Sequence, residues 1–423
     1  MKNLGIYIHI PFCLRKCPYC DFYSVSEAQV GAAEIDDLKG RFVKALCREI
    51  EAGGRKYGKN TGGKAGFKEK PRGESRQVDT IFFGGGTPSL LSADELEEIL
   101  TAVNNSFPVS KNAEISIECN PATASAEKLA AYRNLGINRL SIGTQSFDDR
   151  VLKILGRMHN SADTLRTVEE ARRAGFDNIS LDLMFAIPGQ TEEIWKDSLR
   201  QALELKPQHI SFYSLEFMDG TPFTRKLEKG EIAETDAEAD RKMYRMALDI
   251  LTEEGFEQYE ISNAAHGTRN ICRHNLKYWS LEEYLGFGPS AHSYMTGADG
   301  RGMRFNNVNS IEIYLKSWED TLEDEGLSAG QPEVPSAVEA FSENTLMDDV
   351  SEYIFTGLRK NSGIELGDFR SRFGKNLWEF YGEDVREKFV EYAEGGFAVK
   401  TDENIRLTVD GMNISNRIMA LFV

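Results

Sequence analysis

The chain has 423 residues, 41% of them hydrophobic, which is enough for a sizeable core and about two or three domains. Its 50 basic and 67 acidic side chains give a formal net charge of −17 at neutral pH, which opposes nucleic-acid binding and favours solubility. No apolar run approaches the roughly 18 residues of a membrane-spanning helix, and the apolar stretch before Pro11 is too short for a signal peptide, so we expect a soluble cytoplasmic protein.

Six strand-like runs alternate with helical patterns through the first half of the chain. The runs cover residues 5–10, 78–83, 114–118, 139–144, 178–184 and 209–215. Between them, Ser92 and Glu95 form a capping box, and Thr191 is typical of a helix N-cap. Strands that alternate with helices pair in parallel through right-handed crossovers. The sequence therefore predicts an α/β fold containing a partial (β/α)6 barrel of the TIM type.

The domain organisation follows from changes in composition. We assign residues 1–230 to the barrel, 231–320 to a connecting region with an aromatic and histidine-rich loop near 260–295, and 346–423 to a small α+β domain, for which a winged-helix arrangement is one interpretation. Residues 53–77 hold seven glycines and eight basic side chains against two acidic ones. Such a segment buries too little apolar surface to order itself, so we predict a flexible basic insertion. A neutral loop expansion is favoured over a docking arm for an acidic partner or anionic lipid.

Three cysteines follow the first predicted strand. Cys13, Cys17 and Cys20 have the spacing Cys-x3-Cys-x2-Cys. Three thiolates on one tight loop can hold three irons of a four-iron cubane and leave the fourth iron open to a small molecule. The alternatives are a zinc site with His9 as a fourth ligand and plain structural cysteines. Disulfides are disfavoured because the remaining cysteines are scattered, as in a protein whose thiols stay reduced.

Polar or glycine-rich segments follow several other strands. The turn 84–87 reads Gly-Gly-Gly-Thr, which lets a backbone approach a ligand closely, and it lacks the lysine of a phosphate-binding P-loop. Glu118, Gln145 and Asp182 lie at or near the ends of the next three strands. Because the carboxyl ends of parallel strands meet at one mouth, we expect these groups to form a common site for hydroxyl or amine recognition.

These residues carry a family resemblance. The tract from Tyr7 through Cys20, with the turn 84–88, resembles the radical S-adenosylmethionine (SAM) superfamily, in the branch of oxygen-independent coproporphyrinogen III oxidase. The match continues at 118–121, 141–147, 156–159 and 182–184, and covers nearly the whole chain except the basic insertion. It implies a [4Fe–4S] cluster on the three cysteines. It also implies SAM contacts from Tyr7, Tyr19, Gly85, Gly86, Thr87, Glu118, Gln145, Arg157 and Asp182.

Two departures separate this chain from the oxidases of that branch. Phe22 stands where those enzymes carry a fourth cysteine, and only six residues precede Tyr7, where they carry an N-terminal arm. Both departures argue against decarboxylation of porphyrinogen propionates. The oxidase-type radical enzyme remains the alternative, and it would need a flavodoxin- or ferredoxin-like electron donor. A third interpretation is an interaction protein with a purely structural cluster.

Residues 274–279 read His-Asn-Leu-Lys-Tyr-Trp, which resembles the His-Asn-x-x-Tyr-Trp motif of the HemW family of heme chaperones. Histidine is a common axial ligand of heme iron, and tyrosine and tryptophan can form a wall for the macrocycle. The resemblance implies heme contacts from His274, Asn275, Tyr278 and Trp279, and transfer of heme to apo-hemoproteins, including respiratory proteins at the membrane. The alternative for His274 is a core histidine among packed aromatic rings. Cys272 and His292 are further heme candidates for which a structural role is favoured, and we assign no catalytic residue.

Overall fold

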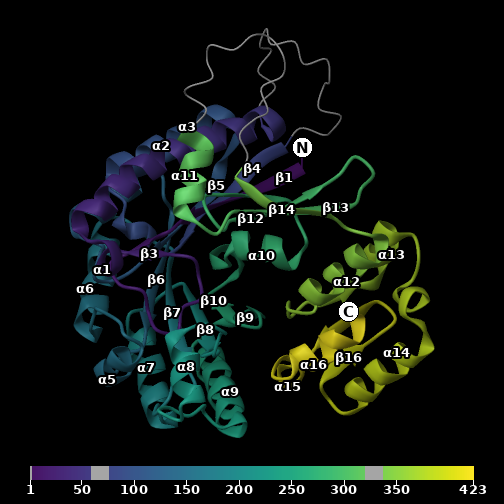
Figure 1. Cartoon of the computed structure of the whole chain (residues 1–423). Helices are drawn as coiled ribbons and strands as arrows, with labels where there is room; N and C mark the ends of the chain where they lie inside the picture. The colour runs from purple at the N-terminus through teal and green to yellow at the C-terminus, as the bar shows by residue number, and fades with distance from the viewer. Residues whose placement is uncertain (1, 59–75, 320–336) are drawn as a thin grey trace, which may run out of the picture.

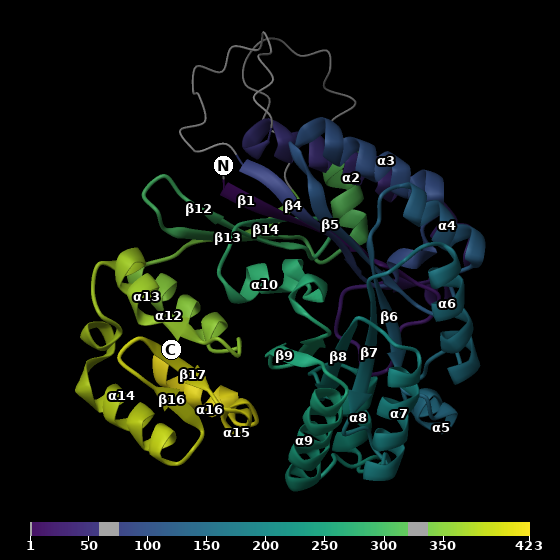
Figure 2. The same ribbon diagram turned by 180° about the vertical axis from the view of Figure 1, so that it is seen from behind.

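The computed structural model describes residues 2–58, 76–319 and 337–423. A curved twelve-stranded sheet has the order β14-β13-β12-β11-β1-β4-β5-β6-β7-β8-β10-β9, with helices along its outer face (Figure 1). The view from behind shows a smaller C-terminal unit on the concave side of this sheet (Figure 2). Within the described residues, no helix is long and apolar enough to cross a membrane.

The central part of the sheet is parallel, from β11 through β8 in the spatial order above. Its strands are β1 (Lys2–Ile10), β4 (Arg76–Gly85), β5 (Val109–Cys119), β6 (Arg139–Gln145), β7 (Ile179–Phe185), β8 (His209–Ser214) and β11 (Tyr284–Phe287). All six predicted strands are among them. The predicted α/β fold with a partial barrel is confirmed, and β11 adds a parallel strand from a distant part of the chain.

Antiparallel strands extend the sheet at both margins. They are β9 (Glu257–Glu260), β10 (Asn263–Ala265), β12 (His292–Thr296), β13 (Gly302–Asn307) and β14 (Val338–Glu343). The segment 260–295, which we expected to be a loop, therefore contains strands and the helix α10 (Arg273–Trp279). That expectation was wrong because short strands in this segment are specified by their partners in the sheet, not by local periodicity. The domain boundary at 230 stays a prediction, and no change of sheet marks it.

Helices cover the outer face of the parallel strands (Figure 1). They are α2 (Ala32–Tyr57), α3 (Ala93–Ser106), α4 (Ala126–Asn134), α6 (Ser161–Arg173), α7 (Glu192–Glu204) and α9 (Ala237–Glu253), with α11 (Ile311–Glu319) beside α2. The predicted caps are confirmed. Ser92 Oγ accepts the Glu95 N–H, and the Glu95 carboxylate accepts the Ser92 N–H. Thr191 Oγ1 accepts the Ile194 N–H at 3.3 Å. The short helices α1 (Glu27–Val30), α5 (Asp149–Ile154) and α8 (Pro222–Glu228) lie in the segments that follow β3 (Val25–Ser26), β6 and β8.

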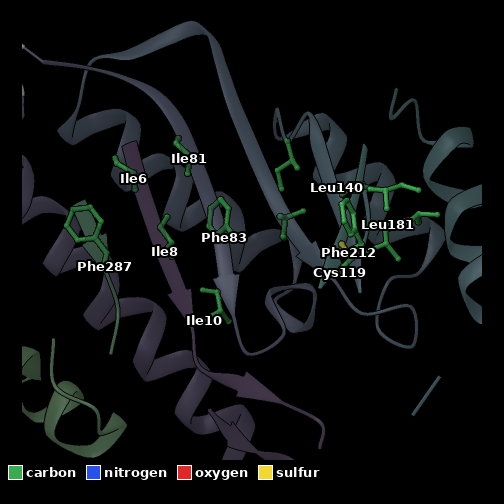
Figure 3. Packing of buried hydrophobic residues seen from close by; sticks show 14 of the residues in the cluster. Ile6, Ile8, Ile10, Ile81, Phe83, Cys119, Leu140, Leu181, Phe212 and Phe287 are labelled. Atoms are coloured by element: carbon green, nitrogen blue, oxygen red, sulfur yellow. The ribbon is translucent and has the colours of Figure 1, made fainter. Parts of the chain in front are cut away.

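The main core lies between the sheet and its outer helices. On β1, Ile6, Ile8 and Ile10 face these helices and are fully buried, next to Ile81 and Phe83 of β4 (Figure 3). Because side chains alternate along a strand, the intervening residues of β1 point to the concave face. Alternate residues of β1 therefore fill the core, and the residues between them face the site.

Part of the predicted basic insertion is regular structure. Residues 53–57 belong to α2, and β4 begins at Arg76, so residues 59–75 of the predicted loop lie outside the described residues. A Cβ on Gly54 would lie 2.4 Å from Ser106 Cβ, and a Cβ on Gly53 would lie 2.8 Å from the ring of Phe287. These glycines permit close packing of α2 on its neighbours, whereas we had interpreted them as signs of flexibility.

The C-terminal unit has the predicted α+β composition. It contains the helices α12 (Leu346–Gly357), α13 (Leu366–Phe373), α14 (Leu377–Glu394), α15 (Val409–Met412) and α16 (Ser415–Met419), and an antiparallel sheet of β15 (Ile364–Glu365), β17 (Asn404–Leu407) and β16 (Ala398–Lys400). The guanidinium of Arg304 on β13 donates to both carboxylate oxygens of Glu352 on α12, at 2.6 and 3.0 Å. The Asn361 N–H donates to Tyr259 O at 3.0 Å. These bonds attach the unit to the barrel.

The buried carboxyl of Glu49 joins distant parts of the fold. It accepts the Gly288 N–H at 2.8 Å, the Tyr314 hydroxyl at 2.6 Å and the Asn307 Nδ2–H at 2.6 Å. Burial raises the pKa of Glu49 to about 7, although these three hydrogen bonds act in the opposite direction. The helix α2 is thereby tied through one ionisable group to α11, β13 and the segment after β11.

We expect the contribution of Glu49 to stability to fall as the pH rises. The pKa of Glu49 is about 7 in the folded protein against 4.5 for an unperturbed carboxyl. The proton is therefore bound more tightly in the folded state, and the stability that this difference contributes is lost as the pH rises through about 7. From about pH 5.5 to about pH 8.5 the loss is about 2 kcal/mol. Thermal unfolding of wild type and Glu49→Gln across this range measures it. The variant should gain on wild type as the pH rises, and a constant difference between the two would contradict the assignment.

Candidate functional site

The cysteine loop is anchored at the carboxyl end of β1. Cys13 ends β2 (Phe12–Cys13), which pairs in parallel with β3 (Val25–Ser26), and the Val25 N–H donates to Pro11 O at 2.7 Å. These bonds close the intervening loop. Inside it, the Cys20 N–H donates to Cys17 O at 3.2 Å, which forms a turn between the second and third cysteines. The three thiols are therefore presented from one closed loop at the mouth of the barrel.

Polar side chains from two other segments, after β4 and after α5, approach the thiols. The Thr87 hydroxyl lies 3.6 Å from Cys13 Sγ, and Arg157 Nη1 lies 3.7 Å from Cys17 Sγ. Burial, and then the neighbouring Cys17 and Cys13 thiolates, raise the pKa of Cys20 to about 11. A thiol ligand must lose its proton to bind metal, and a metal cation favours that loss. Three partly desolvated thiols on one loop suit a cationic group that neutralises them together.

The site fits a cluster better than a single metal ion. Within residues 2–58, 76–319 and 337–423, no three His, Cys, Asp or Glu side chains stand close enough to hold one metal ion. His9, the fourth zinc ligand considered above, has both ring nitrogens in hydrogen bonds, one with the Tyr7 hydroxyl at 3.1 Å and one with Tyr23 O at 2.9 Å. A tetrahedral zinc site needs four converging ligands, whereas a cubane distributes its cysteines over separate irons.

The glycine turn after β4 is packed against the cysteine segment. The Gly86 N–H donates to Ile10 O at 2.8 Å and the Thr87 N–H to Phe12 O at 2.7 Å. A Cβ on Gly86 would lie 2.7 Å from Phe12 O and 3.1 Å from Cys13 Sγ, so only glycine fits. Gly85 has a φ of 110°, and a Cβ there would lie 2.6 Å from the His9 ring. The turn thus places backbone without a side chain beside the thiol of Cys13.

Two carboxyls of the predicted site come from β5 and β7, the strands on either side of β6. Glu118 on β5 accepts the Gly85 N–H at 3.2 Å, and Asp182 on β7 accepts the Ser141 hydroxyl at 2.9 Å. Burial, and then the charge of Asp182, raise the pKa of Glu118 to about 8. Burial also raises the pKa of Asp182 above its ordinary value. Both carboxyls have lost hydration through burial, and hydrogen bonds to hydroxyl or amine groups of a ligand would replace it.

Arg157 and Gln145 complete the polar side of the mouth. Arg157 Nη2 donates to Gly143 O at 2.7 Å, while its buried Nε has no hydrogen-bond partner in the described part of the chain. A small pocket lies beside it, lined among others by Cys17, Thr87 and Asn120. Gln145 has a φ of 64° and accepts the Tyr213 hydroxyl at 3.0 Å. An unpartnered buried guanidinium N–H next to a pocket favours an anionic ligand such as a carboxylate.

The two tyrosines of the predicted cofactor site come from the cysteine loop and from β1. Tyr19 packs edge-on against Phe223 of α8, with 6.2 Å between ring centres. Tyr7 lies on the concave face of β1, 6.3 Å from the stacked ring of Phe82. Burial raises the pKa of both tyrosine hydroxyls, so they stay protonated and serve as hydrogen-bond donors. The predicted cofactor residues therefore converge on one mouth, and their individual roles stay predictions.

The helix α10, which carries the predicted heme motif, lies on the concave side of the sheet (Figure 2). His274 is only 1% exposed. Its Nδ1 lies 2.8 Å from Thr80 Oγ1 and its Nε2 lies 2.9 Å from the Tyr278 hydroxyl. Its ring stacks 5.3 Å from Phe82 and 6.5 Å from Tyr7. Both ring nitrogens of His274 therefore have partners within the fold, and its role in heme binding stays a prediction.

The rest of the motif is also engaged within the fold. Tyr278 packs edge-on against Tyr284, and the guanidinium of Arg359 lies 4.3 Å above the Trp279 ring. Asn275 is half-buried. Cys272 is fully buried, with its Sγ 3.8 Å from Glu114 Oε1. Burial lowers the pKa of His274 to about 3, so its imidazole is neutral at all physiological pH.

The sequence interpretation missed a polar layer beneath the cofactor residues. Ser141 and Tyr213 hold Asp182 and Gln145 in place, and Ser180 joins Asp182 to His209 by hydrogen bonds of 3.2 and 2.8 Å. These residues come from the inward-facing positions of β6, β7 and β8. Their signal was present as polar residues at alternate positions of otherwise apolar strands. The sequence prediction considered only the strand ends, and these residues lie within the strands.

Comparisons with known proteins place the chain in a family. Residues 7–202 match the radical SAM superfamily, and residues 344–413 match the HemN C-terminal domain. The heme chaperone HemW of Bacillus subtilis (strain 168) is 33% identical over 418 residues, covering 99% of this chain and 98% of that protein. HemW of Escherichia coli (strain K12) is 37% identical over 304 residues, covering 72% of this chain and 73% of that protein.

Two further similarities extend along the chain. The mitochondrial radical S-adenosyl methionine domain-containing protein 1 of Bos taurus is 31% identical over 420 residues, covering 99% of this chain and 87% of that protein. The structure of coproporphyrinogen III oxidase (HemN) from Escherichia coli, a radical SAM enzyme, aligns with a TM-score of 0.80 at 20% identity over 100% of this chain and 90% of that one. At such low identity the structural likeness shows the fold alone. From the cysteine loop, the partial barrel and the full-length similarities together, the chain belongs to the radical SAM superfamily and, within it, to the HemW family.

Proposed function

We propose that this protein is a heme chaperone, which binds heme and passes it to acceptor hemoproteins. The observation that carries the proposal is the contact between its two predicted sites: the ring of His274 in the motif helix lies 6.5 Å from that of Tyr7 in the cofactor mouth. The full-length similarity to curated HemW heme chaperones supports the same function. Respiratory hemoproteins at the membrane are the proposed acceptors.

Membership of the radical SAM superfamily implies SAM and a [4Fe–4S] cluster. The cluster with SAM supplies one-electron chemistry at its open iron when bound. Cys13, Cys17 and Cys20 would hold the cluster. Tyr7, Tyr19, Gly85, Gly86, Thr87, Glu118, Gln145, Arg157 and Asp182 would bind SAM. The unpartnered Nε of Arg157 and the close approach of Gly86 to Cys13 both fit such a ligand.

We further propose that SAM gates heme transfer and is not consumed. Tyr7 stacks on Phe82, and Phe82 stacks on His274 at 5.3 Å, so one aromatic column connects the cofactor mouth to the motif helix. Packed side chains with few alternative arrangements transmit a shift at one end to the other. The chain's own residues would thereby couple occupancy of the mouth to the position of α10.

Heme binding and transfer by the reconstituted full chain test this function. Under anaerobic conditions, we expect stoichiometric hemin binding by the cluster-loaded protein, followed by transfer to an apo-hemoprotein that is detected by its absorption spectrum. Addition of SAM should change the transfer rate without forming 5′-deoxyadenosine. Failure to bind hemin, or retention of hemin in the presence of excess acceptor, would contradict the chaperone function.

The same preparation tests the oxidase alternative. Coproporphyrinogen III, SAM and a low-potential reductant are supplied, and products are followed by chromatography. We expect no protoporphyrinogen, since Phe22, which is 61% exposed, stands where the oxidases have a fourth cysteine. Protoporphyrinogen formed in proportion to 5′-deoxyadenosine would establish an enzyme in place of a chaperone.

A further inference from the structure

A continuous chain of hydrogen bonds leads from the cofactor mouth into the barrel. Ser180 Oγ lies 3.2 Å from Asp182 Oδ1 and 2.8 Å from His209 Nδ1. His209 Nε2 lies 2.8 Å from the Tyr259 hydroxyl, and the Cys272 N–H donates to that hydroxyl at 3.3 Å. Cys272 is the N-cap residue of α10. Four hydrogen bonds therefore join a carboxyl of the predicted cofactor site to the start of the motif helix.

The direction of each bond in this chain follows from its partners. Burial lowers the pKa of His209 well below its ordinary value, so the imidazole is neutral and carries one N–H. The Cys272 N–H can only donate, so the single proton of the Tyr259 hydroxyl is left for His209 Nε2. The opposite tautomer would leave that proton without an acceptor in the described part of the chain, which costs free energy. His209 Nδ1–H therefore donates to Ser180, whose own proton goes to Asp182.

This alignment stabilises the carboxylate at one end of the chain. Hydrogen bonds that run in one direction polarise one another, and a low dielectric strengthens them. Ser180 and His209 are fully buried, so both conditions are met here. Asp182 also accepts the Ser141 hydroxyl at 2.9 Å. The carboxylate is thereby held in one orientation, and its remaining lone pairs can accept a hydroxyl or amine of the cofactor.

Tyr259 lies where three parts of the fold meet. It belongs to β9, which lies between the barrel and the C-terminal unit (Figure 2). Its carbonyl accepts the Asn361 N–H of that unit at 3.0 Å, while its hydroxyl accepts the Cys272 N–H of α10. The next two amides of α10 donate to Glu114 instead, at 3.0 and 3.1 Å. Of these three amides, that of Cys272 reports on the hydrogen-bond chain, and the other two do not.

We propose that His209 and Tyr259 are positioning residues of the SAM site. They orient the Asp182 carboxylate through Ser180, and they link occupancy of the mouth to the first turn of α10. In this assignment neither residue touches SAM. The inference rests on the proposed SAM site and needs no heme ligand. It is separate from the aromatic column described above, because the two connections have no residue in common.

Titration of SAM into the cluster-loaded full chain tests the assignment with Tyr259→Phe, which removes one hydroxyl and keeps the ring. Loss of a neutral hydrogen bond from the chain should weaken SAM binding about two- to tenfold at unchanged iron content. Tyr244→Phe is the matched control. The Tyr244 hydroxyl is also buried and donates to Ile261 O at 2.8 Å, close to the C-terminal unit but outside the chain. This control should bind SAM as wild type does.

A double-mutant cycle separates the hydrogen-bond chain from a general loss of stability. Ser180→Ala cuts the bond next to Asp182, so Tyr259→Phe should weaken SAM binding no further in that background. Two residues that merely supported the fold would act independently, and their effects on affinity would multiply. His209→Asn, which is too short to reach Tyr259, gives the same comparison if Tyr259→Phe is too unstable for titration.

Amide hydrogen exchange gives a second measurement on the same proteins. Coupling between two sites is reciprocal, so SAM should slow exchange of the Cys272 amide by a similar factor, about two- to tenfold. In Tyr259→Phe this protection should be lost. The amides of Arg273 and His274 donate to Glu114 and should be slowed less by SAM than that of Cys272.

The outcomes separate this inference from the site on which it rests. Equal SAM affinity in Tyr259→Phe and wild type would overturn the inference and leave the SAM site intact. Effects that multiply in the double variant, or an equal loss of affinity in Tyr244→Phe, would also overturn it, because the loss would then be structural. Absence of SAM binding by wild type at full iron content would overturn the proposed SAM site and this inference together.

Discussion

Replacement of Cys17 by serine is expected to leave the chain without its iron–sulfur cluster. Cys17 lies on the loop between β2 and β3, half-exposed, with its thiol 3.7 Å from Arg157 Nη1. A serine hydroxyl does not ionise near neutral pH, so one corner of the cubane loses its thiolate, and such clusters are held by thiolates. Iron should fall from about four atoms per chain to less than about one after anaerobic reconstitution. Iron and sulfide analysis with the visible absorption spectrum measures this loss.

The control for this experiment is Cys47→Ser. Cys47 lies half-buried on α2. Burial, and then the nearby Glu98 and Glu51, raise the pKa of its thiol to about 12, which disfavours the thiolate form that binds metal. Its iron content should equal that of wild type. A Cys17→Ser protein that keeps its full iron content would remove Cys17 from the ligand set. Zinc in place of iron in the reconstituted wild type would restore the zinc alternative.

Replacement of Arg157 by alanine is expected to weaken SAM binding while the cluster stays intact. The side chain is fixed by its bond to Gly143 O at 2.7 Å, and its unpartnered Nε lies next to the pocket lined by Cys17 and Thr87. A charge-assisted hydrogen bond to a carboxylate is worth about 1.5–3 kcal/mol. The affinity for SAM should therefore fall on the order of 10- to 100-fold. Anaerobic isothermal titration of SAM into cluster-loaded protein measures the change.

Two variants make this prediction specific. Arg157→Lys keeps the charge but not the rigid fork of donors, and it should recover part of the affinity. Arg150→Ala removes a nearby guanidinium that is exposed and already paired with Asp148, and it should bind SAM as wild type does. Equal SAM affinity in Arg157→Ala and wild type, at equal iron content, would show that the guanidinium does not contact the cofactor.

Local sequence patterns were enough to predict the parallel strands from β1 to β8, but not β11. The alternation of Ile6, Ile8 and Ile10 specifies a strand with one face in the core, and Ser92 with Glu95 specifies the start of a helix. Each of these signals depends on residues within a few positions of one another. The cysteine loop belongs to the same class, because its three thiols share one short segment.

The packing of distant segments against the barrel was not predictable in this way. The strand β11 pairs with β1 although more than 270 residues separate Tyr7 from its partner Gly286. The glycines at 53 and 54 resembled a loop because the residues they pack against, Phe287 and Ser106, lie far away in the sequence. Neither local propensity nor periodicity carries information about such partners.

The sequence by itself determined the scaffold and the set of groups available for chemistry, since three clustered cysteines and polar residues at successive strand ends follow from local spacing. Only the tertiary structure decided which of those groups a ligand can reach. It buried His274 between Thr80, Tyr278 and Phe82, and it left His292 exposed at the start of β12. The physical reason is that exposure and hydrogen bonding depend on what packs against a side chain, and those neighbours come from remote parts of the chain.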